Sequence, residues 1–149
     1  MDYKYMDIAF NEAKKAFDLN EVPVGAVIVK NGVVLAKGYN MKEMKKSCIK
    51  HAEIIAIEKA SKKLDNWRLN DCDIYLTLDP CPMCASAIKQ ARIKNVYSAC
   101  LNSDNNTTSI IKKIFMSDDI NPRVNYFTNI DIKRSNELLN AFFTIRRNK

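Results

Sequence analysis

Apolar positions along the chain change repeatedly between helical and strand spacing. Residues 6–17 have apolar side chains three or four positions apart, which predicts an amphipathic helix. Two β-branched runs follow at 22–30 and 33–39, joined by Asn31-Gly32, a dipeptide typical of a two-residue hairpin turn. Because proline cannot donate to a central ladder, Pro23 is expected at the beginning of its strand.

The rest of the chain alternates strands and helices. After a basic, irregular stretch at 41–50, the pattern predicts helices at 51–64, 82–92, 109–116 and 132–147, strands at 73–79, 94–100 and 124–127, and a polar loop at 102–108. This order favours an α/β fold, a three-layer α/β/α sandwich in which helices cover both faces of a mixed five-stranded sheet. Residues 1–149 are expected to form one domain.

Composition narrows the class of protein without identifying it. Apolar residues make up 47% of the 149 positions and charged residues 28%, as in average globular proteins. No apolar run approaches the roughly 18 residues of a membrane span, and the N-terminus does not resemble a signal peptide, so we expect a cytoplasmic protein without a membrane partner. The net charge of +7 fits either a polyanionic partner or a lysine-rich solvated surface.

The cysteines point to a metal or a redox centre. Their number, five, is odd, and Cys81 and Cys84 form a C-x-x-C, which in a reducing compartment favours metal binding or redox chemistry over a structural bridge. Cys48, Cys72 and Cys100 have no such spacing, although Cys48 lies close in sequence to His51.

His51, Cys81 and Cys84 provide the donor set of a catalytic zinc site. Zinc of this kind takes three nitrogen or sulfur ligands and leaves a fourth position for water. His51 and the C-x-x-C lie at the beginnings of two predicted helices, which can face a common point. Cys81 and Cys84 are one helical turn apart, and the partial positive charge of a helix N-terminus favours thiolates.

Glu53 is the candidate proton carrier. In the first turn of its helix it can reach the space beyond the helix end, beside the metal. A carboxylate there can take a proton from water and deliver it to the departing amine. The only histidine of the chain heads an H-x-E, and P-C-x-x-C follows, the combination typical of zinc deaminases of nucleobases. The competing interpretation is a structural or redox C-x-x-C, which would need a further ligand, with Cys48 the nearest candidate.

The chain resembles the cytidine deaminase superfamily and, within it, the bacterial tRNA-specific adenosine deaminases. The resemblance rests on these segments: EVPVGAV (21–27), GYN (38–40), HAEIIAI (51–57), NWRL (66–69), TLDPCPMCASAI (77–88) and FFTIRR (142–147). It implies a homodimer with one Zn²⁺ per chain that deaminates adenosine to inosine at the wobble position of a tRNA anticodon stem-loop. His51, Cys81 and Cys84 would bind the zinc, and Glu53 would move the proton.

The same resemblance assigns substrate contacts. Asn40 would hydrogen-bond the flipped-out base, and Val24 and Ala52 would line its pocket. A plain turn residue is the alternative for Asn40. Asn102 stands where the family has an acidic residue, in a loop that lies beside the bound nucleotide in the family and that here has no glycine. Asp79 replaces the usual glutamate before P-C-x-x-C.

The C-terminal segment combines aromatic and cationic residues. Phe142, Phe143, Arg146 and Arg147 could contact RNA by stacking and by binding phosphates. The alternative is that the phenylalanines belong to the core and the arginines to a solvated helix end. The lysine-rich stretch from residue 42 to 50 leaves the same choice between phosphate contacts and a solvated loop.

Two other functions remain open at this point. A deaminase of a free base or nucleotide (guanine, cytosine or deoxycytidylate) would share the four residues of the zinc site and differ in its loops. A catalytically silent, zinc-stabilised RNA-binding module would keep zinc and RNA binding without turnover, and the presence of Glu53 argues against it.

Overall fold

A computed structural model describes residues 1–101, 105–118 and 122–147. The elements along the chain are α1 (Tyr3–Asp18), β1 (Gly25–Lys30), β2 (Val33–Tyr39), α2 (Ala52–Leu64), β3 (Cys72–Leu76), α3 (Pro82–Gln90), β4 (Asn95–Ser98), α4 (Asn105–Met116), β5 (Asn125–Phe127) and α5 (Ile132–Arg147). None of the helices within these ranges combines the length and apolar character needed to cross a membrane.

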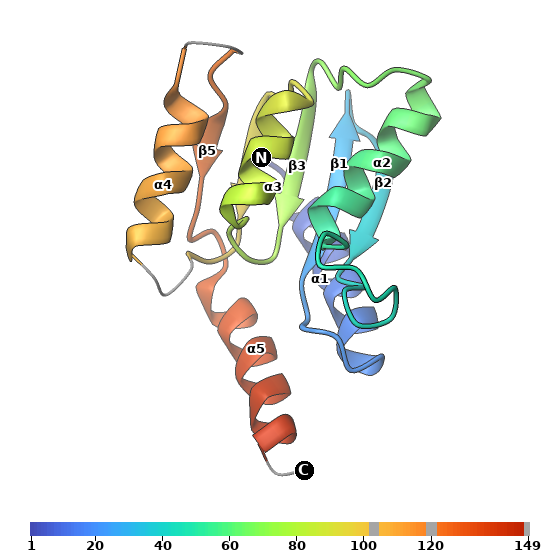
Figure 1. Cartoon of the computed structure of the whole chain (residues 1–149), viewed down its shortest axis with the longest axis vertical. Helices are drawn as coiled ribbons and strands as arrows, with labels where there is room; N and C mark the ends of the chain where they lie inside the picture. Colours follow the sequence, from blue (N-terminus) through green and yellow to red (C-terminus); the bar gives the residue numbers. More distant parts are fainter. Residues whose placement is uncertain (102–104, 119–121, 148–149) are drawn as a thin grey trace.

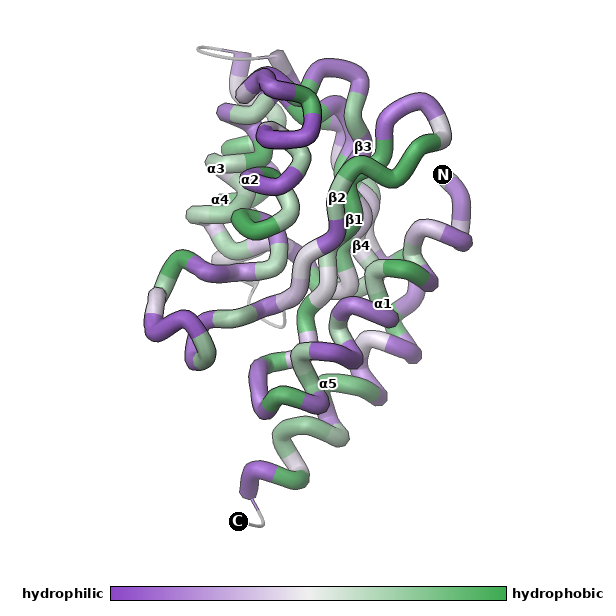
Figure 2. Tube along the Cα trace, turned by 90° about the vertical axis from the view of Figure 1, so that its right-hand side faces the viewer, coloured by the Kyte–Doolittle hydropathy of each residue, from purple (hydrophilic) through white to green (hydrophobic). Residues whose placement is uncertain are grey.

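The strands form one mixed sheet in the order β2-β1-β3-β4-β5. β1 is antiparallel to both β2 and β3, whereas β3, β4 and β5 run parallel to one another. Helices α2, α3 and α4 lie on one side of the sheet, and α1 and α5 lie on the other, with α5 extending beyond the sheet end (Figures 1 and 2). The predicted three-layer α/β/α sandwich is therefore confirmed.

Alternation along the strands divides the core into two halves. In β1, Ala26 and Ile28 pack under α2 and α3, while Val27 and Val29 pack under α1. Such alternation is what a strand covered on both faces requires. The half under α2 and α3 is the larger, and it supports the two helix ends that carry the predicted metal ligands.

The hairpin and one close helix contact explain two glycines. Asn31 and Gly32 have φ values of 50° and 77°, the positive pair that a type I′ turn requires, so the predicted turn is confirmed. A Cβ on Gly38 would lie 2.5 Å from the carbonyl oxygen of Ala52. Gly38 therefore lets β2 approach the first turn of α2, next to His51.

Three predicted boundaries were wrong by three or four residues. β1 begins at Gly25 instead of residue 22, so Pro23 lies before the strand, in a segment where Val24 N–H donates to Val22 O. β3 ends at Leu76 instead of residue 79, because the chain then turns to bring residues 78–81 toward α2. Helix α4 begins at Asn105, within the predicted loop at 102–108; its first turn is polar because short polar side chains suit the unpaired N–H groups of a helix start.

Candidate metal centre and adjoining pocket

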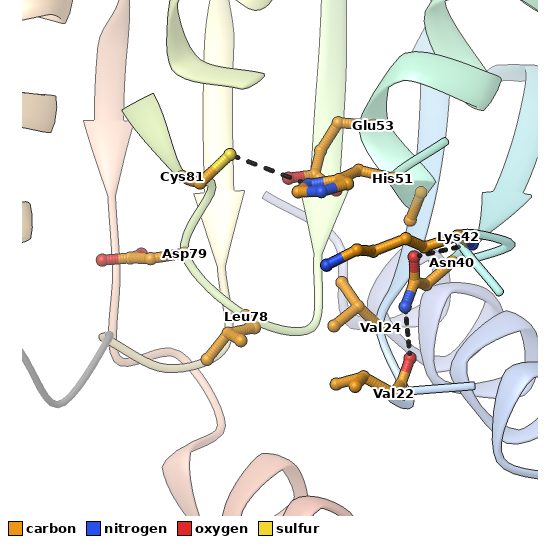
Figure 3. Close-up of a pocket in the computed structure, with 10 residues that line it drawn as sticks. Val22, Val24, Asn40, Lys42, His51, Glu53, Leu78, Asp79 and Cys81 are labelled. Carbon is orange, nitrogen blue, oxygen red and sulfur yellow. Dashed lines mark hydrogen bonds between the residues drawn. The ribbon is translucent and has the colours of Figure 1, made fainter. Parts of the chain in front are cut away.

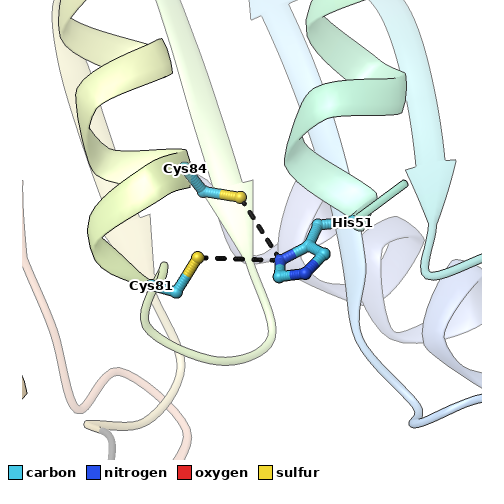
Figure 4. A group of neighbouring side chains, drawn as sticks. All are labelled: His51, Cys81 and Cys84. Carbon is cyan, nitrogen blue, oxygen red and sulfur yellow. Dashed lines mark hydrogen bonds between the residues drawn. The ribbon is translucent and has the colours of Figure 1, made fainter. Parts of the chain in front are cut away.

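The N-terminal ends of α2 and α3 meet on one side of the sheet. His51 is the residue that caps α2, Cys81 caps α3, and Cys84 lies in the first turn of α3. Both caps have extended backbone, and neither forms a capping hydrogen bond with its side chain, so the imidazole and the thiol remain available as ligands. Figure 4 shows the three side chains converging from the two helix ends.

The separations of these side chains fit one zinc ion. His51 Nδ1 lies 3.7 Å from Cys81 Sγ and 3.5 Å from Cys84 Sγ. Zinc–sulfur bonds of about 2.3 Å and zinc–nitrogen bonds of about 2.1 Å at a tetrahedral angle place nitrogen and sulfur about 3.6 Å apart. Within the described residues no other trio of histidine, cysteine or acidic side chains is grouped in this way. Cys48 is exposed and lies outside the cluster.

The pKa values of the two thiols are shifted in opposite directions. The pKa of Cys81 is lowered to about 5, chiefly because the Cys84 thiol donates a hydrogen bond to the Cys81 thiolate. The same hydrogen bond, together with burial, raises the pKa of Cys84. One thiolate is thus ready at neutral pH, and a metal ion would have to displace the proton of Cys84 to gain the second.

Glu53, the second residue of α2, is only 3% exposed. Burial raises the pKa of its carboxyl group to about 7, because the charged form loses its hydration. The nearby Cys81 raises this pKa further, while the backbone N–H of Glu53 and the imidazole of His51 lower it. A carboxyl group with this pKa can both accept and release a proton near neutral pH.

A cavity of about 230 Å³ opens next to the cluster (Figure 3). It is lined by Val22, Val24, Asn40, Lys42, His51, Ala52, Glu53, Leu78, Asp79 and Cys81. The three residues that the resemblance assigned to base binding therefore line the same cavity as Glu53 and two of the proposed ligands, His51 and Cys81. The cavity is smaller than the 300–1,000 Å³ or so of sites for larger ligands, and it suits a single base.

Asn40 is held in place by its neighbours. Its amide nitrogen Nδ2 donates to Val22 O at 3.3 Å, and its Oδ1 accepts from Lys42 N–H at 3.4 Å. A primary amide has two N–H donors and two acceptor lone pairs, so one of each is left for another partner. With 9% of its surface exposed, at the cavity wall, Asn40 can present them to a bound molecule.

Sequence reasoning did not identify Val22, Leu78 and Asp79 as cavity residues. Asp79 is buried, and its carboxylate accepts hydrogen bonds from Tyr126 Oη at 2.5 Å and Thr128 Oγ1 at 2.9 Å, which ties the cavity wall to β5. Burial and this carboxylate raise the pKa of Tyr126. The available signal was adjacency, because Val22 and Leu78 are apolar residues inside or beside the quoted motifs.

The C-terminal candidates separate into buried and exposed residues. Phe142 is 3% exposed and its ring packs against Phe17 at 6.0 Å, whereas Phe143 is 44% exposed. Arg146 and Arg147 are exposed, and the guanidinium of Arg146 lies over the ring of Phe142 at 5.4 Å. None of these four residues lines the cavity. Asn102 lies outside the described residues.

Comparisons with known proteins show which family the chain resembles. The chain matches the family described as MafB19-like deaminase over residues 1–147. A tRNA-specific adenosine deaminase of Bacillus subtilis (strain 168) is 34% identical over 99% of this chain and 92% of its own length. A solved structure from a study of A-to-I editing by tRNA:A34 deaminases at the wobble position of transfer RNA has a TM-score of 0.85 and 32% identity, covering 93% of this chain and all (100%) of that one.

A solved structure of guanine deaminase from Bacillus subtilis is also similar. It has a TM-score of 0.65 and 31% identity, covering 99% of this chain and 95% of that chain. The chain is therefore similar both to proteins named for adenosine in tRNA and to one named for a free purine base.

Proposed function

Because the chain belongs to the MafB19-like deaminase family and is similar along nearly its whole length to a bacterial tRNA-specific adenosine deaminase, we propose that it converts adenosine to inosine at the wobble position of a tRNA anticodon. The observation that carries this proposal is the convergence of His51, Cys81 and Cys84 beside a base-sized cavity that Glu53 also lines. The reaction consumes one water molecule and releases ammonia.

The chain's donor set supports one Zn²⁺ held by His51, Cys81 and Cys84. The separations of about 3.6 Å expected for a tetrahedral site match the observed 3.5 and 3.7 Å. When bound, zinc would act as a Lewis acid that lowers the pKa of a coordinated water toward about 7.

Glu53 carries the proton that the reaction moves. Its carboxylate accepts a proton from the attacking water as the oxygen approaches C6 of the adenine ring. The resulting carboxylic acid then donates that proton to the exocyclic amine, which departs as ammonia, while the remaining hydroxyl proton ends on N1 of the ring as the C6 carbonyl of inosine forms; Glu53 is thereby returned to its starting state. Burial raises the pKa of this carboxyl group and so favours the acid form needed in the second half of the cycle, while a bound cation favours the carboxylate needed in the first half.

Asn40, Val24 and Ala52 recognise the base. The spare donor and acceptor of the Asn40 amide can bond the edge of a flipped-out purine, while Val24 and Ala52 provide apolar surface for its faces. Outside the cavity, Phe143, Arg146 and Arg147 are proposed RNA contacts, supported by their exposure at the end of α5. Phe142 is left out of this set because its ring is buried.

We extend the proposal to the rest of the molecule. A single deaminase domain over residues 1–149 is supported by the family match over residues 1–147. A homodimer and a cytoplasmic location are supported by the resemblance of the sequence to the tRNA deaminases and by a tRNA substrate. Light scattering at several protein concentrations would measure the mass of the assembly, and a purely monomeric protein would remove the dimer from this proposal.

A free-base deaminase is the second candidate. The observation that favours it is the likeness to a guanine deaminase at 31% identity, together with a cavity that encloses little more than one base. Such an enzyme would use the same four residues on guanine.

Product analysis separates the two candidates. Zinc-loaded protein is incubated with an anticodon stem-loop that carries a wobble adenosine and, separately, with guanine, cytosine, cytidine and deoxycytidylate. Inosine in the stem-loop alone supports the proposed function. Turnover of a small molecule beside an unchanged stem-loop overturns it in favour of the second candidate.

A further inference from the structure

Residues 41–50, called here the basic loop, join the proposed base-binding residue Asn40 to the proposed ligand His51. The loop is closed at its base, where Met41 N–H donates to Lys50 O at 2.9 Å. Turns inside it are formed by Lys45 N–H bonded to Met41 O at 2.9 Å and Ser47 N–H bonded to Lys42 O at 3.0 Å. The basic loop is thus a compact segment whose two ends both adjoin the cavity.

A buried carboxylate anchors the basic loop to the body of the protein. Glu21 is 1% exposed, and its Oε1 accepts from Glu43 N–H at 3.0 Å while its Oε2 accepts from Met44 N–H at 2.7 Å. No lysine or arginine forms an ion pair with Glu21 among the residues that the structure describes. A buried carboxylate without hydrogen bonds is costly, so both oxygens of Glu21 favour this one loop position.

The anchored loop directs one cation to the cavity. Among the cavity-lining residues Lys42 alone is a lysine or arginine, and Figure 3 shows its side chain extended from the loop toward the cavity. Its neighbours Lys45 and Lys46 belong to the same loop but do not line the cavity. Within the described parts of the chain, Lys42 forms no ion pair, which leaves its ammonium group for a bound anion.

We propose that Lys42 is a specificity-determining residue that binds a backbone phosphate flanking the deaminated nucleotide, and that Glu21 is the residue that positions it. This inference rests on the proposed function, because the anion at the mouth of a base-sized cavity is then the phosphate attached to the ribose of the bound base. It also gives the site a means to favour a nucleotide within a strand over a free base, which has no phosphate to offer.

The first test compares three variants on the anticodon stem-loop. Lys42→Ala is expected to lower kcat/KM about tenfold through KM, with kcat nearly unchanged, since a charge-assisted contact is lost. The dependence of log KM on log salt concentration should become shallower by about 0.7, the value for one phosphate contact of a single strand. Lys42→Arg should restore most of the affinity. Lys45→Ala, which removes the same charge from the same loop, should change KM at most about twofold.

The second test identifies the phosphate. Stem-loops with a neutral methylphosphonate linkage on the 5′ side or on the 3′ side of the wobble adenosine are assayed with wild type and with Lys42→Ala. At one of the two linkages, neutralisation should raise the wild-type KM and leave the KM of Lys42→Ala unchanged. The ratio of the KM of Lys42→Ala to the KM of wild type is then compared between substrates. If this ratio is the same on both neutral substrates as on the unmodified stem-loop, Lys42 does not bind either flanking phosphate and the proposal is wrong.

The role of Glu21 is tested by its coupling to Lys42. Glu21→Gln replaces one carboxylate oxygen with an NH2 group, which cannot accept a hydrogen bond from a loop N–H. KM should therefore rise by a few-fold, while zinc content and circular dichroism stay at wild-type values. The double variant Glu21→Gln/Lys42→Ala should be no worse than Lys42→Ala alone. Additive losses in this double variant would contradict a positioning role.

The outcome for wild type separates this inference from the proposed function. Wild type that forms inosine in the stem-loop, with Lys42→Ala indistinguishable from Lys45→Ala, overturns the role of Lys42 and leaves the function standing. Wild type that turns over only a free base overturns the function, and the phosphate contact with it.

Discussion

The metal centre and the exposed end of α5 were both assigned functional roles from the sequence, but the fold defines them very differently. His51 and Cys81 are the N-terminal caps of two helices that pack on the same core, and Glu53 is buried in the first turn of one of them. Arg146 and Arg147 project from the last turn of a helix that extends beyond the sheet (Figure 1). Chemistry here is built on rigid helix ends, while the proposed recognition of RNA uses peripheral side chains with fewer constraints.

This difference predicts the largest effect for loss of a ligand. Cys84→Ala leaves two of the three proposed ligands and should reduce zinc to far below one equivalent per chain, with activity lost to background. Metal content by atomic emission and inosine formation measure the two effects. Cys48→Ser, at an exposed cysteine outside the cluster, is the matched control and should keep both. Full zinc content in Cys84→Ala would show that the ligand set is wrong.

Loss of the proton carrier should be the next largest effect. Glu53→Gln keeps the size of the side chain but cannot accept a proton, so kcat should fall about 10³- to 10⁴-fold while zinc stays bound. Single-turnover inosine formation and metal analysis are the measurements. Glu58→Gln, an exposed carboxyl on the same helix, should be close to wild type. A loss of only a few-fold in Glu53→Gln would mean that another group moves the proton.

The acidity of Glu53 gives the metal centre a pH signature. Burial raises the pKa of this carboxyl group to about 7, so the carboxylate that accepts the proton is depleted as pH falls through that value. A bound cation favours the carboxylate and moves the midpoint to lower pH. We expect kcat/KM to fall up to about tenfold per pH unit on the acid side of the midpoint. A pH profile on the stem-loop measures this, and a profile that stays flat from pH 8 down to about 4, the ordinary pKa of a glutamate, would contradict it.

The same contrast explains how far the sequence could predict the molecule. The grouping of His51, Cys81 and Cys84 was predictable because these residues are one helical turn apart or stand at a helix start, and such local spacing survives folding. Phe142 and Phe143 were not separable, because only the contact of Phe142 with Phe17 in α1 decides which ring is buried. The position of Lys42 was hidden for a similar reason, since the N–H groups of Glu43 and Met44 in its loop donate to Glu21, a residue about twenty positions away in the sequence.

Two boundaries of helices and strands could not be predicted from the pattern of polar and apolar residues. The polar run before Ile110 predicted a loop, yet α4 begins at Asn105, because a first turn that is not buried, as Asn106, Thr107 and Thr108 show, needs no apolar contacts. β3 ends early at Leu76, where the chain leaves the sheet to carry Leu78, Asp79 and Cys81 to the cavity. The strand pattern in the sequence continues to residue 79, although Leu78 and Asp79 lie at the cavity and not in the sheet.

The end of α5 should show the smallest effect. Arg147→Ala removes an exposed charge without a contact in the core, whereas Arg146→Ala also removes a cation from the ring of Phe142. The double variant should therefore raise KM for the stem-loop by a few-fold and leave kcat and the pH profile unchanged. The dependence of log KM on log salt concentration should become shallower by the amount expected for roughly one to two phosphate contacts. Lys133→Ala, at the exposed beginning of the same helix, is the control and should leave the salt dependence as in wild type. If the double variant and Lys133→Ala give the same salt dependence, the arginines are surface charges, and recognition of the strand is confined to residues at the cavity.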